Sequence, residues 1–357
     1  MRTLHLIGSK SLGGAENFFL RFTDALKDIE NIEVYVGIRR GSKVESSVTD
    51  KMRSFSLPFY TIWDPISKYA ISRLIKKLKP DIVQTYMSRA TRLTHISSNK
   101  VVHIARLGGY YGLHGFRHAH AWIGNTKGIC DYLIKNGFNK ERVFHISNFV
   151  ELAGDVSEDQ KNNLKQKLNI PKGSFVILTP ARFVSVKGHE VLLKALRLLI
   201  HDSSIDKNLK VILLGDGPLK KKLYSLGNEL GINKYIIWPG WQNDVGAFYS
   251  IADLIVFPSL KMETLGNVVL EAWSYKKPLV CTRFRGALEI TKDMEDSIHA
   301  ECGDAVSLYK AIKKAMKDPS LCNYIAENGY NKVKNKFNKE VILKQYVDVY
   351  NYLLEKI

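Results

Sequence analysis

The sequence predicts two doubly wound α/β domains in tandem, on the basis of three observations. Short apolar runs alternate with longer amphipathic stretches, which is typical of a parallel sheet covered by helices. The alternation starts near residue 3 and starts again at 174, after a polar stretch at 151–172. The length of 357 residues agrees with about two domains. We therefore expect an N-terminal domain over 1–160, a C-terminal domain over 161–337, and a terminal helix over 338–357 that packs across the domain joint.

Each element is predicted from its own apolar pattern. In the first domain, apolar β-branched runs predict strands at 3–7, 33–38, 81–85, 101–105, 121–123 and 143–146, and helical periodicity predicts helices at 16–29, 69–78 and 128–136. In the second domain, the same criteria predict strands at 174–181, 209–214, 235–238, 254–257 and 278–281, with helices at 190–200, 219–230 and 245–250. Ligands bind beyond the carboxyl ends of the strands in such sheets, so the loops there are the first place to look for chemistry.

The charge is strongly basic and unevenly distributed. The chain has 53 Lys and Arg against 35 Asp and Glu, a net charge of +18. Residues 1–150 contribute 23 minus 11, or +12, so the N-terminal domain carries most of the excess. This balance favours a polyanionic partner such as nucleic acid, an anionic membrane or a phosphorylated substrate, although solubility alone explains it equally well.

The cysteines and the apolar runs indicate a soluble protein of a reducing compartment, so we expect a cytoplasmic location. Four cysteines lie far apart, and no CxxC pair is present that would indicate a zinc ribbon or a redox dithiol. The first residues hold too short an apolar run for a signal peptide. No run approaches the about 20 apolar residues of a membrane-spanning helix.

A glycine pair follows the first predicted strand. The loop from Gly8 to Glu16 is neither a Walker A sequence nor GxGxxG, which argues against a P-loop enzyme and a nicotinamide dehydrogenase. What remains is Gly13-Gly14 at a strand-to-helix turn. Such a turn lets backbone N–H groups approach an anion, and it is equally consistent with a plain tight turn.

Two loops of the second domain combine cations with glycines. Arg182 and Lys187 follow the first strand, and together they offer a forked donor and a point charge that suit a diphosphate. Two exposed surface cations are the alternative in so basic a chain. Gly215 and Gly217 follow the next strand, where backbone can approach a ligand closely, although such turns are common.

The most informative segment is 257–272. A strand ends at Pro258, a loop carries Glu263, and a helix opens near Gly266 and contains Glu271. The unpaired N–H groups and positive dipole end of a helix start form a ready seat for phosphate. The two carboxylates beside it are suited to accept hydrogen bonds from sugar hydroxyls. The local chemistry therefore indicates a nucleotide-sugar.

The pair Glu263 and Glu271 resembles the E-x7-E element of retaining glycosyltransferases of family 4, which have the GT-B fold of two Rossmann-like domains facing a central cleft. The pieces GGAE, RF…KGHE, LLGDGP, PGW…ADL…FPS and ETLGNVVLEAW occur in the family's order from about residue 4 to the terminal helix. The segments RLGGYY, GNT…ICDYL and NFV are most similar to enzymes that build lipopolysaccharide core or other bacterial surface glycans.

The resemblance implies a role for each matching residue. Arg182 and Lys187 are expected to hold the donor diphosphate, with Glu263 on the donor sugar and Glu271 on the ribose. Further donor contacts are expected at Leu265, Gly266, Asn267, Gly215, Gly217 and Trp241, the last near the base, and Gly13 and Gly14 are expected to close the cleft. The implied reaction is a retaining hexosyl transfer from a nucleoside-diphosphate sugar, a co-substrate, to a glycan or glycolipid acceptor that carries phosphate in some cases.

Two positions depart from the family pattern. Many members have Glu-Gly-Phe-Gly where this chain has Glu263-Thr264-Leu265-Gly266, which leaves the sugar open. Many also carry a His after a first-domain strand, where this chain has Arg106, Gly108 and Gly109, an acceptor-side candidate group. His114, His118 and His120 lie nearby, but lone histidines are more often structural. No Asp-x-Asp motif is present, so neither a metal nor another cofactor is expected.

The basic first domain suggests a peripheral contact with the anionic cytoplasmic face of the inner membrane. The cations concerned are Lys68, Arg73, Lys76, Lys77 and Lys79, with Arg117 elsewhere in the domain. A solvated face is the alternative. A GT-B epimerase or a sugar phosphorylase would share the donor domain, and a catalytically inactive scaffold would share the whole fold. A nucleic-acid-binding protein would explain the charge, but no recognition module is present and no nucleic acid is expected.

Overall fold

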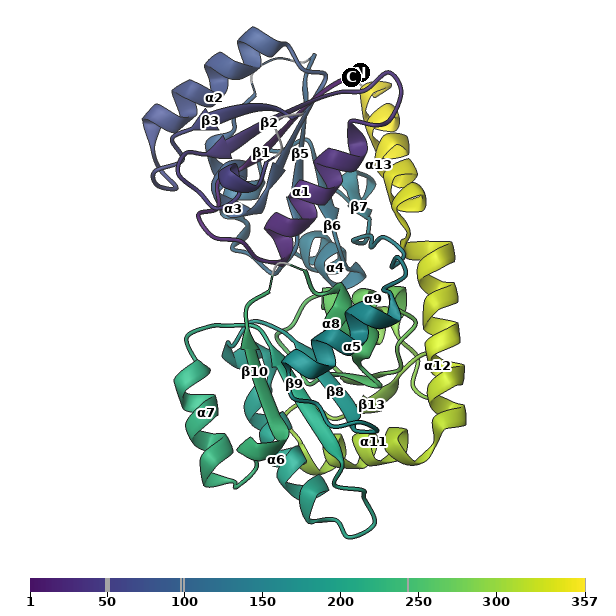
Figure 1. The fold of residues 1–357 in the computed structure, drawn as a ribbon. Helices are drawn as coiled ribbons and strands as arrows, with labels where there is room; N and C mark the ends of the chain where they lie inside the picture. The colour runs from purple at the N-terminus through teal and green to yellow at the C-terminus, as the bar shows by residue number, and fades with distance from the viewer. Residues whose placement is uncertain (49–51, 97, 99, 243, 357) are drawn as a thin grey trace. The chain divides into compact units, whose positions relative to one another are not determined.

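The computed structural model describes residues 1–48, 52–96, 98, 100–242 and 244–356, and the chain divides into two compact units (Figure 1). The N-terminal unit comprises Met1–Asn148 with Lys339–Ile357, and the C-terminal unit comprises Phe149–Asn338. The division falls before the expected boundary at 160. The terminal helix α13 (Lys339–Leu354) belongs to the N-terminal unit, where it lies against α1 (Gly14–Leu26).

The N-terminal unit is built on one parallel sheet of seven strands in the order β3-β2-β1-β4-β5-β6-β7. The strands are β1 (Arg2–Ile7), β2 (Glu33–Arg39), β3 (Arg53–Leu57), β4 (Ile82–Tyr86), β5 (Val102–Leu107), β6 (Ala121–Gly124) and β7 (Val143–His145). Six of them were predicted. The missing one, β3, lies at the edge and is largely exposed, so it has no continuous apolar run by which it could be recognised.

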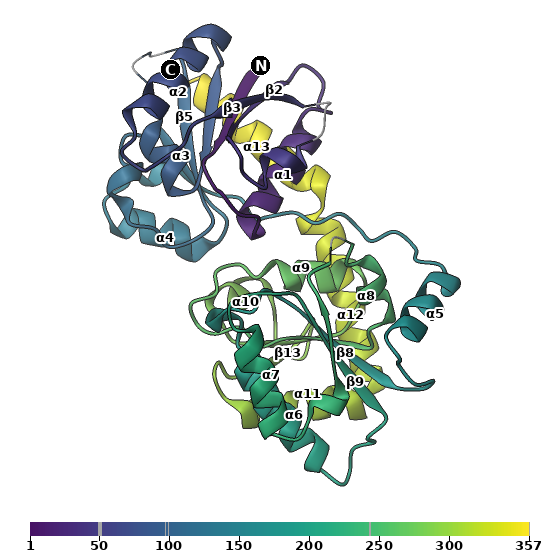
Figure 2. The same ribbon diagram turned by 60° about the vertical axis from the view of Figure 1, so that its left-hand side comes forward.

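Helices cover this sheet on both faces (Figures 1 and 2). Besides α1 and α13 they are α2 (Pro65–Leu78), α3 (Met87–Leu93) and α4 (Lys127–Lys135). Asp64 caps α2 by accepting a hydrogen bond from the backbone N–H of Ile66, and Pro65 occupies the first helical position. The buried side of α2 is formed by Ser67, Ile71, Leu74 and Leu78, which recur at helical spacing.

The C-terminal unit repeats the arrangement with six parallel strands in the order β10-β9-β8-β11-β12-β13. The strands are β8 (Phe175–Pro180), β9 (Leu209–Leu214), β10 (Ile236–Gly240), β11 (Leu254–Phe257), β12 (Leu279–Thr282) and β13 (Ile298–Ala300). The helices are α5 (Glu158–Lys167), α6 (His189–His201), α7 (Lys220–Glu229), α8 (Gly246–Ile251), α9 (Asn267–Ser274), α10 (Arg285–Ile290), α11 (Ala305–Lys317) and α12 (Pro319–Lys332).

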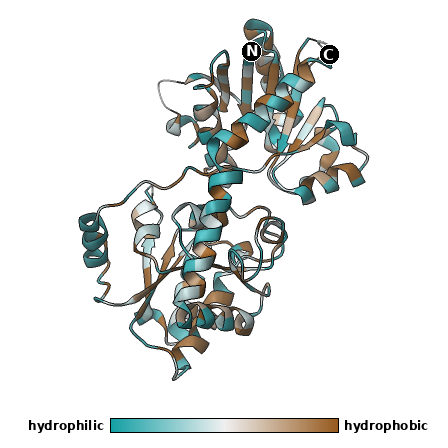
Figure 3. Cartoon of the chain, turned by 90° about the vertical axis from the view of Figure 1, so that its right-hand side faces the viewer, coloured by the Kyte–Doolittle hydropathy of each residue, from teal (hydrophilic) through white to brown (hydrophobic). Residues whose placement is uncertain are grey.

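The core of the C-terminal unit has two halves, one on each face of the sheet. Ile177 and Val211 belong to one buried cluster, whereas their neighbours Leu178 and Ile212 belong to the other. Adjacent strand residues point to opposite faces, so the near-continuous apolar runs follow from a sheet that is covered twice. In Figure 3 the helices show both hydrophilic (teal) and hydrophobic (brown) residues along their length, as expected for elements with one buried side.

The strand order determines where a ligand site can form in this unit. The chain order reverses between β8 and β11, which pair as neighbours at the centre of the sheet. In open parallel sheets the crevice beyond the carboxyl ends of two such strands is the usual ligand site. The loops that leave β8 and β11 carry the predicted residues Arg182, Lys187 and Glu263. Among the described residues, no helix is long and apolar enough to cross a membrane.

Candidate active site

An ion pair joins the two loops at the switch point of the C-terminal unit. The Lys187 ammonium donates a hydrogen bond to Glu263 Oε2 at 2.6 Å, and the two side chains are 22% and 11% exposed. Ser259 Oγ donates to the same carboxylate oxygen at 3.1 Å. The Lys187 nitrogen also lies 5.0 Å from the centre of the Phe257 ring. A cation and an acid are thus held together and remain accessible to a ligand.

Close backbone contacts between the loops fix this pair. The N–H of Leu260 donates to the carbonyl of Val186 at 2.7 Å. Gly188 has a left-handed conformation, with φ of 68°, and a Cβ there would lie 1.9 Å from the carbonyl oxygen of Pro258. Only glycine fits this approach. The glycine of the KG sequence therefore brings the loop of Lys187 against the loop of Glu263.

Gly215 and Gly217, in the loop after β9, lie against the loop after β8. A Cβ at Gly215 would be 2.2 Å from the carbonyl oxygen of Ala181, and one at Gly217 would be 2.6 Å from that of Phe183. The N–H of Phe183 donates to the carbonyl of Asp216 at 2.9 Å. The two glycines hold the loop that carries Arg182 in place, a function that the sequence did not reveal.

The helix α9 begins directly after the loop of Glu263. Gly266 is its N-cap residue with φ of 72°, and a Cβ there would lie 2.7 Å from the rings of both Phe257 and Phe284. Leu265 is 2% exposed and Asn267 is the first helical residue. The predicted helix start is therefore correctly located, and its N–H groups belong to the same edge of the sheet as Lys187.

Glu271 lies in the middle of α9 and is oriented by a buried tyrosine. The Tyr249 hydroxyl donates to Glu271 Oε2 at 2.8 Å. The Tyr249 ring is fully buried and stacks on Tyr275 with ring centres 4.8 Å apart. Burial, together with the nearby Glu271 charge, raises the pKa of Tyr249 well above its usual value, so the hydroxyl keeps its proton and its donor function.

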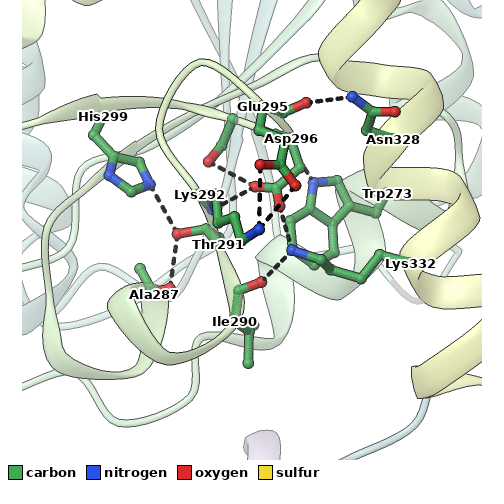
Figure 4. Close-up of polar contacts among 11 residues, drawn as sticks. Trp273, Ala287, Ile290, Thr291, Lys292, Glu295, Asp296, His299, Asn328 and Lys332 are labelled. Atoms are coloured by element: carbon green, nitrogen blue, oxygen red, sulfur yellow. Dashed lines mark hydrogen bonds and ion pairs between the residues drawn. The ribbon is translucent and has the colours of Figure 1, made fainter.

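A polar network on the far side of α9 fixes the helix (Figure 4). Trp273 donates from its indole nitrogen to the carbonyl of Asp296 at 2.9 Å, and the Lys332 ammonium pairs with the Asp296 carboxylate, which is 1% exposed. A Cβ at Gly329 would lie 2.1 Å from the Trp273 ring. The helix α12 thus packs closely on α9 and anchors the element that carries Glu271.

Two further predicted donor residues project into solvent. Arg182 is exposed and forms no ion pair with any residue that the structure describes. The Trp241 side chain follows β10 and is 61% exposed. Both are therefore available to a ligand, whereas Lys187 and Glu263 are already engaged with each other. Sequence reasoning missed Ser259 and Tyr249, although Ser259 lies only four residues before Glu263.

In the N-terminal unit, the glycine turn is closed by the side chains of its own loop. Gly13 is the N-cap residue of α1, which starts at Gly14. Glu16 is 5% exposed and accepts a hydrogen bond from Ser9 Oγ. A Cβ at Gly13 would lie 3.1 Å from the Glu16 carboxylate. The negative charge at the start of α1 is therefore supplied by Glu16 in this structure.

Arg106, an acceptor-side candidate from the sequence, is buried within its own unit. Its side chain is 3% exposed and its guanidinium lies 3.8 Å above the Phe18 ring. Nε donates to the Tyr346 hydroxyl at 2.8 Å, and Nη2 donates to Asn148 Oδ1. Arg106 thus joins β5 to α13 inside the unit. Gly108 lies next to it, and a Cβ there would be 3.8 Å from Arg106 Nη1.

The remaining candidates of this unit lie in surface turns. Gly109 lies beside the Tyr111 ring, to which a Cβ would make an ordinary contact at 3.6 Å. His118 Nε2 lies 2.9 and 2.8 Å from the carbonyl oxygens of Thr91 and Thr94, and its ring stacks on His95. His120 Nδ1 accepts from the N–H of His103. These two histidines therefore stabilise turns. Among the described residues, no cluster of His, Cys, Asp and Glu could hold a metal ion.

Comparison with known proteins identifies the domain that holds the switch-point site. Residues 160–332 match the family described as glycosyl transferases group 1. The C-terminal unit is a group 1 glycosyltransferase domain. Every donor-side residue from Arg182 to Glu271 falls within the matched range of this glycosyltransferase domain.

The likeness to glycosyltransferases extends over the whole chain. The chain is 29% identical to the lipopolysaccharide core biosynthesis glycosyltransferase LpsE of Rhizobium meliloti (strain 1021), with 98% of each chain covered. It is 26% identical to UDP-Gal:alpha-D-GlcNAc-diphosphoundecaprenol alpha-1,3-galactosyltransferase of Escherichia coli, covering 95% of this chain and 94% of the relative. The structure of Anabaena Alr3699/HepE with UDP and glucose matches with a TM-score of 0.86 at 19% identity, over 99% of this chain and 100% of that one. The GT-B fold is thereby confirmed.

Proposed function

We propose that the protein transfers a sugar from a nucleoside-diphosphate sugar to a hydroxyl of a glycan or glycolipid, with retention of anomeric configuration. The observation that carries the proposal is the accessible Lys187–Glu263 pair, held at the switch point directly before the start of α9. The names of the relatives support a place in lipopolysaccharide core or surface polysaccharide biosynthesis.

The diphosphate is proposed to bind between Lys187, Arg182 and the N-terminus of α9. Negative charge grows on this leaving group as the bond from the anomeric carbon breaks, and preorganised donors stabilise it. Lys187 already lies against Glu263, so it needs only to share its three N–H donors between the carboxylate and a phosphate oxygen. The exposed Arg182 supplies the forked donor.

Glu263 is proposed to orient the donor sugar. Its Oε2 accepts from both Lys187 and Ser259, which leaves Oε1 to accept from a sugar hydroxyl. A carboxylate paired with an ammonium is a poor nucleophile, so we propose a same-face substitution. The acceptor oxygen bonds to the anomeric carbon as the diphosphate leaves, and the departing diphosphate oxygen takes the acceptor proton. Glu271, oriented by Tyr249, is proposed to bind the ribose.

The donor is proposed to be a UDP-sugar in the first instance, because the relative from Escherichia coli is named for UDP-Gal and the Anabaena structure holds UDP. The acceptor is proposed to bind the N-terminal unit, at the cytoplasmic face of the inner membrane. The +12 excess over residues 1–150 supports a phosphorylated glycolipid at an anionic surface. The cations beside the donor are proposed to make a divalent metal unnecessary.

A transfer assay tests this function. The purified chain is incubated with UDP-sugars and a lipopolysaccharide-core acceptor, with and without EDTA, and the anomeric configuration of the product is read by proton NMR. We expect a retained configuration, activity in EDTA, and loss of activity in Glu263→Gln but not in the exposed control Glu229→Gln. An inverted product would contradict the proposal. Turnover of the donor without an acceptor would favour an epimerase or a hydrolytic side reaction.

A further inference from the structure

One stretch of the N-terminal unit exposes an unusual number of large apolar side chains. Within ten residues, five of them are between 38% and 69% exposed, namely Tyr60, Ile62, Trp63, Ile66 and Tyr69. We call these five residues the α2 patch. Among the described residues of the same unit, the only other large apolar side chain exposed to this degree is Tyr352. Scattered single exposures need no explanation, but a cluster marks an interaction site.

The local fold holds these side chains outward. The carboxylate of Asp64 accepts from the N–H of Tyr60 at 3.2 Å and from that of Ile66 at 3.0 Å, which fixes the loop and the first turn of α2 together. The Arg92 guanidinium lies 3.8 Å above the Trp63 ring and sets its orientation. The patch is thus a preorganised surface, and α2 lies at the outside of its unit (Figure 1).

The rest of the outer side of α2 is cationic. Lys68, Arg73, Lys76 and Lys77 are exposed, and none of them pairs with a carboxylate of a residue that the structure describes. Between residues 52 and 96 the only acids are Asp64, which is 6% exposed, and Asp81, which accepts from the N–H of Arg2. Aromatic and aliphatic side chains bordered by unpaired cations are typical of surfaces that enter an anionic lipid interface.

We infer that the α2 patch inserts into the headgroup region of an anionic bilayer, with the cations of α2 against the lipid phosphates. The patch follows the carboxyl end of β3, on the edge of the sheet where a ligand of this unit would bind. Arg89 joins the loop after β1 to the loop after β3, because it donates to the carbonyls of Gly8 and Phe59 at 3.2 and 3.3 Å. Insertion would therefore place the membrane beside the acceptor edge. The inference rests on the proposed function for its choice of a bilayer as partner.

Vesicle co-sedimentation tests the inference without any sugar chemistry. The full chain is sedimented with vesicles of phosphatidylcholine mixed with phosphatidylglycerol, and with vesicles of phosphatidylcholine alone. We expect binding to the anionic vesicles, a loss of at least about tenfold in the partition coefficient for the double variant Trp63→Ser/Ile66→Ser, and no loss for the control Tyr224→Ser/Tyr324→Ser. The control side chains are 51% and 55% exposed, and they lie in the other unit.

The outcomes separate insertion from the alternatives. Brominated lipid should quench the tryptophan fluorescence of the wild-type protein, and Trp63→Phe should remove most of that quenching. Equal binding of the double variant and the wild type would show that net charge alone attracts the protein, and it would overturn the inference. A concentration-dependent dimer that the double variant abolishes would assign the patch to a second copy, also against the inference. Donor-induced thermal shifts, measured without vesicles, report on the proposed function separately.

Discussion

The two units differ in how far the charged residues at the carboxyl edge of their sheets are exposed. In the C-terminal unit, Lys187 and Glu263 pair with each other and remain 22% and 11% exposed, so a ligand can reach both. In the N-terminal unit, Arg106 lies at the carboxyl end of β5, yet it is 3% exposed and donates to Tyr346 and Asn148. A cation at a strand end is therefore a ligand candidate only where the surrounding packing leaves it accessible.

The largest effect that this comparison predicts is on catalysis. Lys187→Ala removes a cation proposed to stabilise the leaving group, and the loss of one such preorganised donor lowers kcat by roughly 10²- to 10³-fold. Thermal unfolding should be measured alongside, because the pair is only 22% and 11% exposed and the loss of the ammonium leaves a largely buried carboxylate without its partner. The exposed residue Lys194 on α6 provides the control, since Lys194→Ala should retain full activity. A Lys187→Ala enzyme with normal kcat would break the comparison.

The second prediction concerns stability at acid pH, which should fall by different amounts in the two units. Burial lowers the pKa of His5 to about 3 and that of His103 well below its usual value, both in the N-terminal unit. In the C-terminal unit burial lowers the pKa of His189 to about 4. A histidine whose folded pKa is depressed contributes stability that is complete above its unfolded pKa of 6.5 and is lost as the pH falls below it. Between the unfolded pKa of about 6.5 and the folded pKa, each fully buried histidine lowers the free energy of unfolding by about 1.4 kcal/mol for each pH unit that the pH falls.

The N-terminal unit holds more of these groups, since burial also lowers the pKa of His95 and that of His120 there, whereas in the C-terminal unit it also lowers only that of His299 among the described histidines. It should therefore open first as the pH falls from 7.5 to 5. Hydrogen exchange followed by mass spectrometry reads the two units separately, and protection should fall earlier in peptides from β1 and β5. Earlier loss of protection in β8 and β11 would contradict this order.

Arg106 gives the third prediction. Arg106→Met keeps most of the volume but removes donors to Tyr346 and Asn148, and hydrogen bonds to a charged group are each worth about 1.5–3 kcal/mol. We expect the N-terminal unit to lose at least about 3 kcal/mol of stability from the two bonds, read by hydrogen exchange in β5 and α13. The donor-induced thermal shift should persist. A stable variant with a raised KM for the acceptor alone would restore the acceptor-side role that the sequence suggested.

The same contrast explains what the sequence could predict. Lys187, Glu263 and the start of α9 lie in loops that directly follow their strands, so local order along the chain was enough to place them together once the sheet was predicted. The burial of Arg106 was not predicted, because its partner Tyr346 is 240 residues away in sequence. The apolar pattern of α13 revealed a helix but not the unit on which the helix packs.

Residues whose role depends on how the side chains of two elements pack together were not predicted either. Tyr249 lies on α8 and Glu271 on α9, and nothing in either segment indicates that the hydroxyl meets the carboxylate. The close approach that requires glycine at 215 and 217 is likewise a property of two loops together. The α2 patch was not predicted, because the exposure of Ile66 and Tyr69 depends on which side of α2 packs on its unit.

The smallest predicted effect concerns Tyr249. Tyr249→Phe keeps the ring that stacks on Tyr275 but removes the hydrogen bond to Glu271, at a cost of about 1 kcal/mol. If Glu271 binds the ribose in the ground state and the transition state alike, KM for the donor should rise about fivefold while kcat stays constant, because uniform binding alone has been weakened. Steady-state kinetics with the donor varied distinguish the two parameters. A fall in kcat with unchanged KM would place Glu271 in the chemical step, and the C-terminal site would then include a second carboxylate that acts in the transition state.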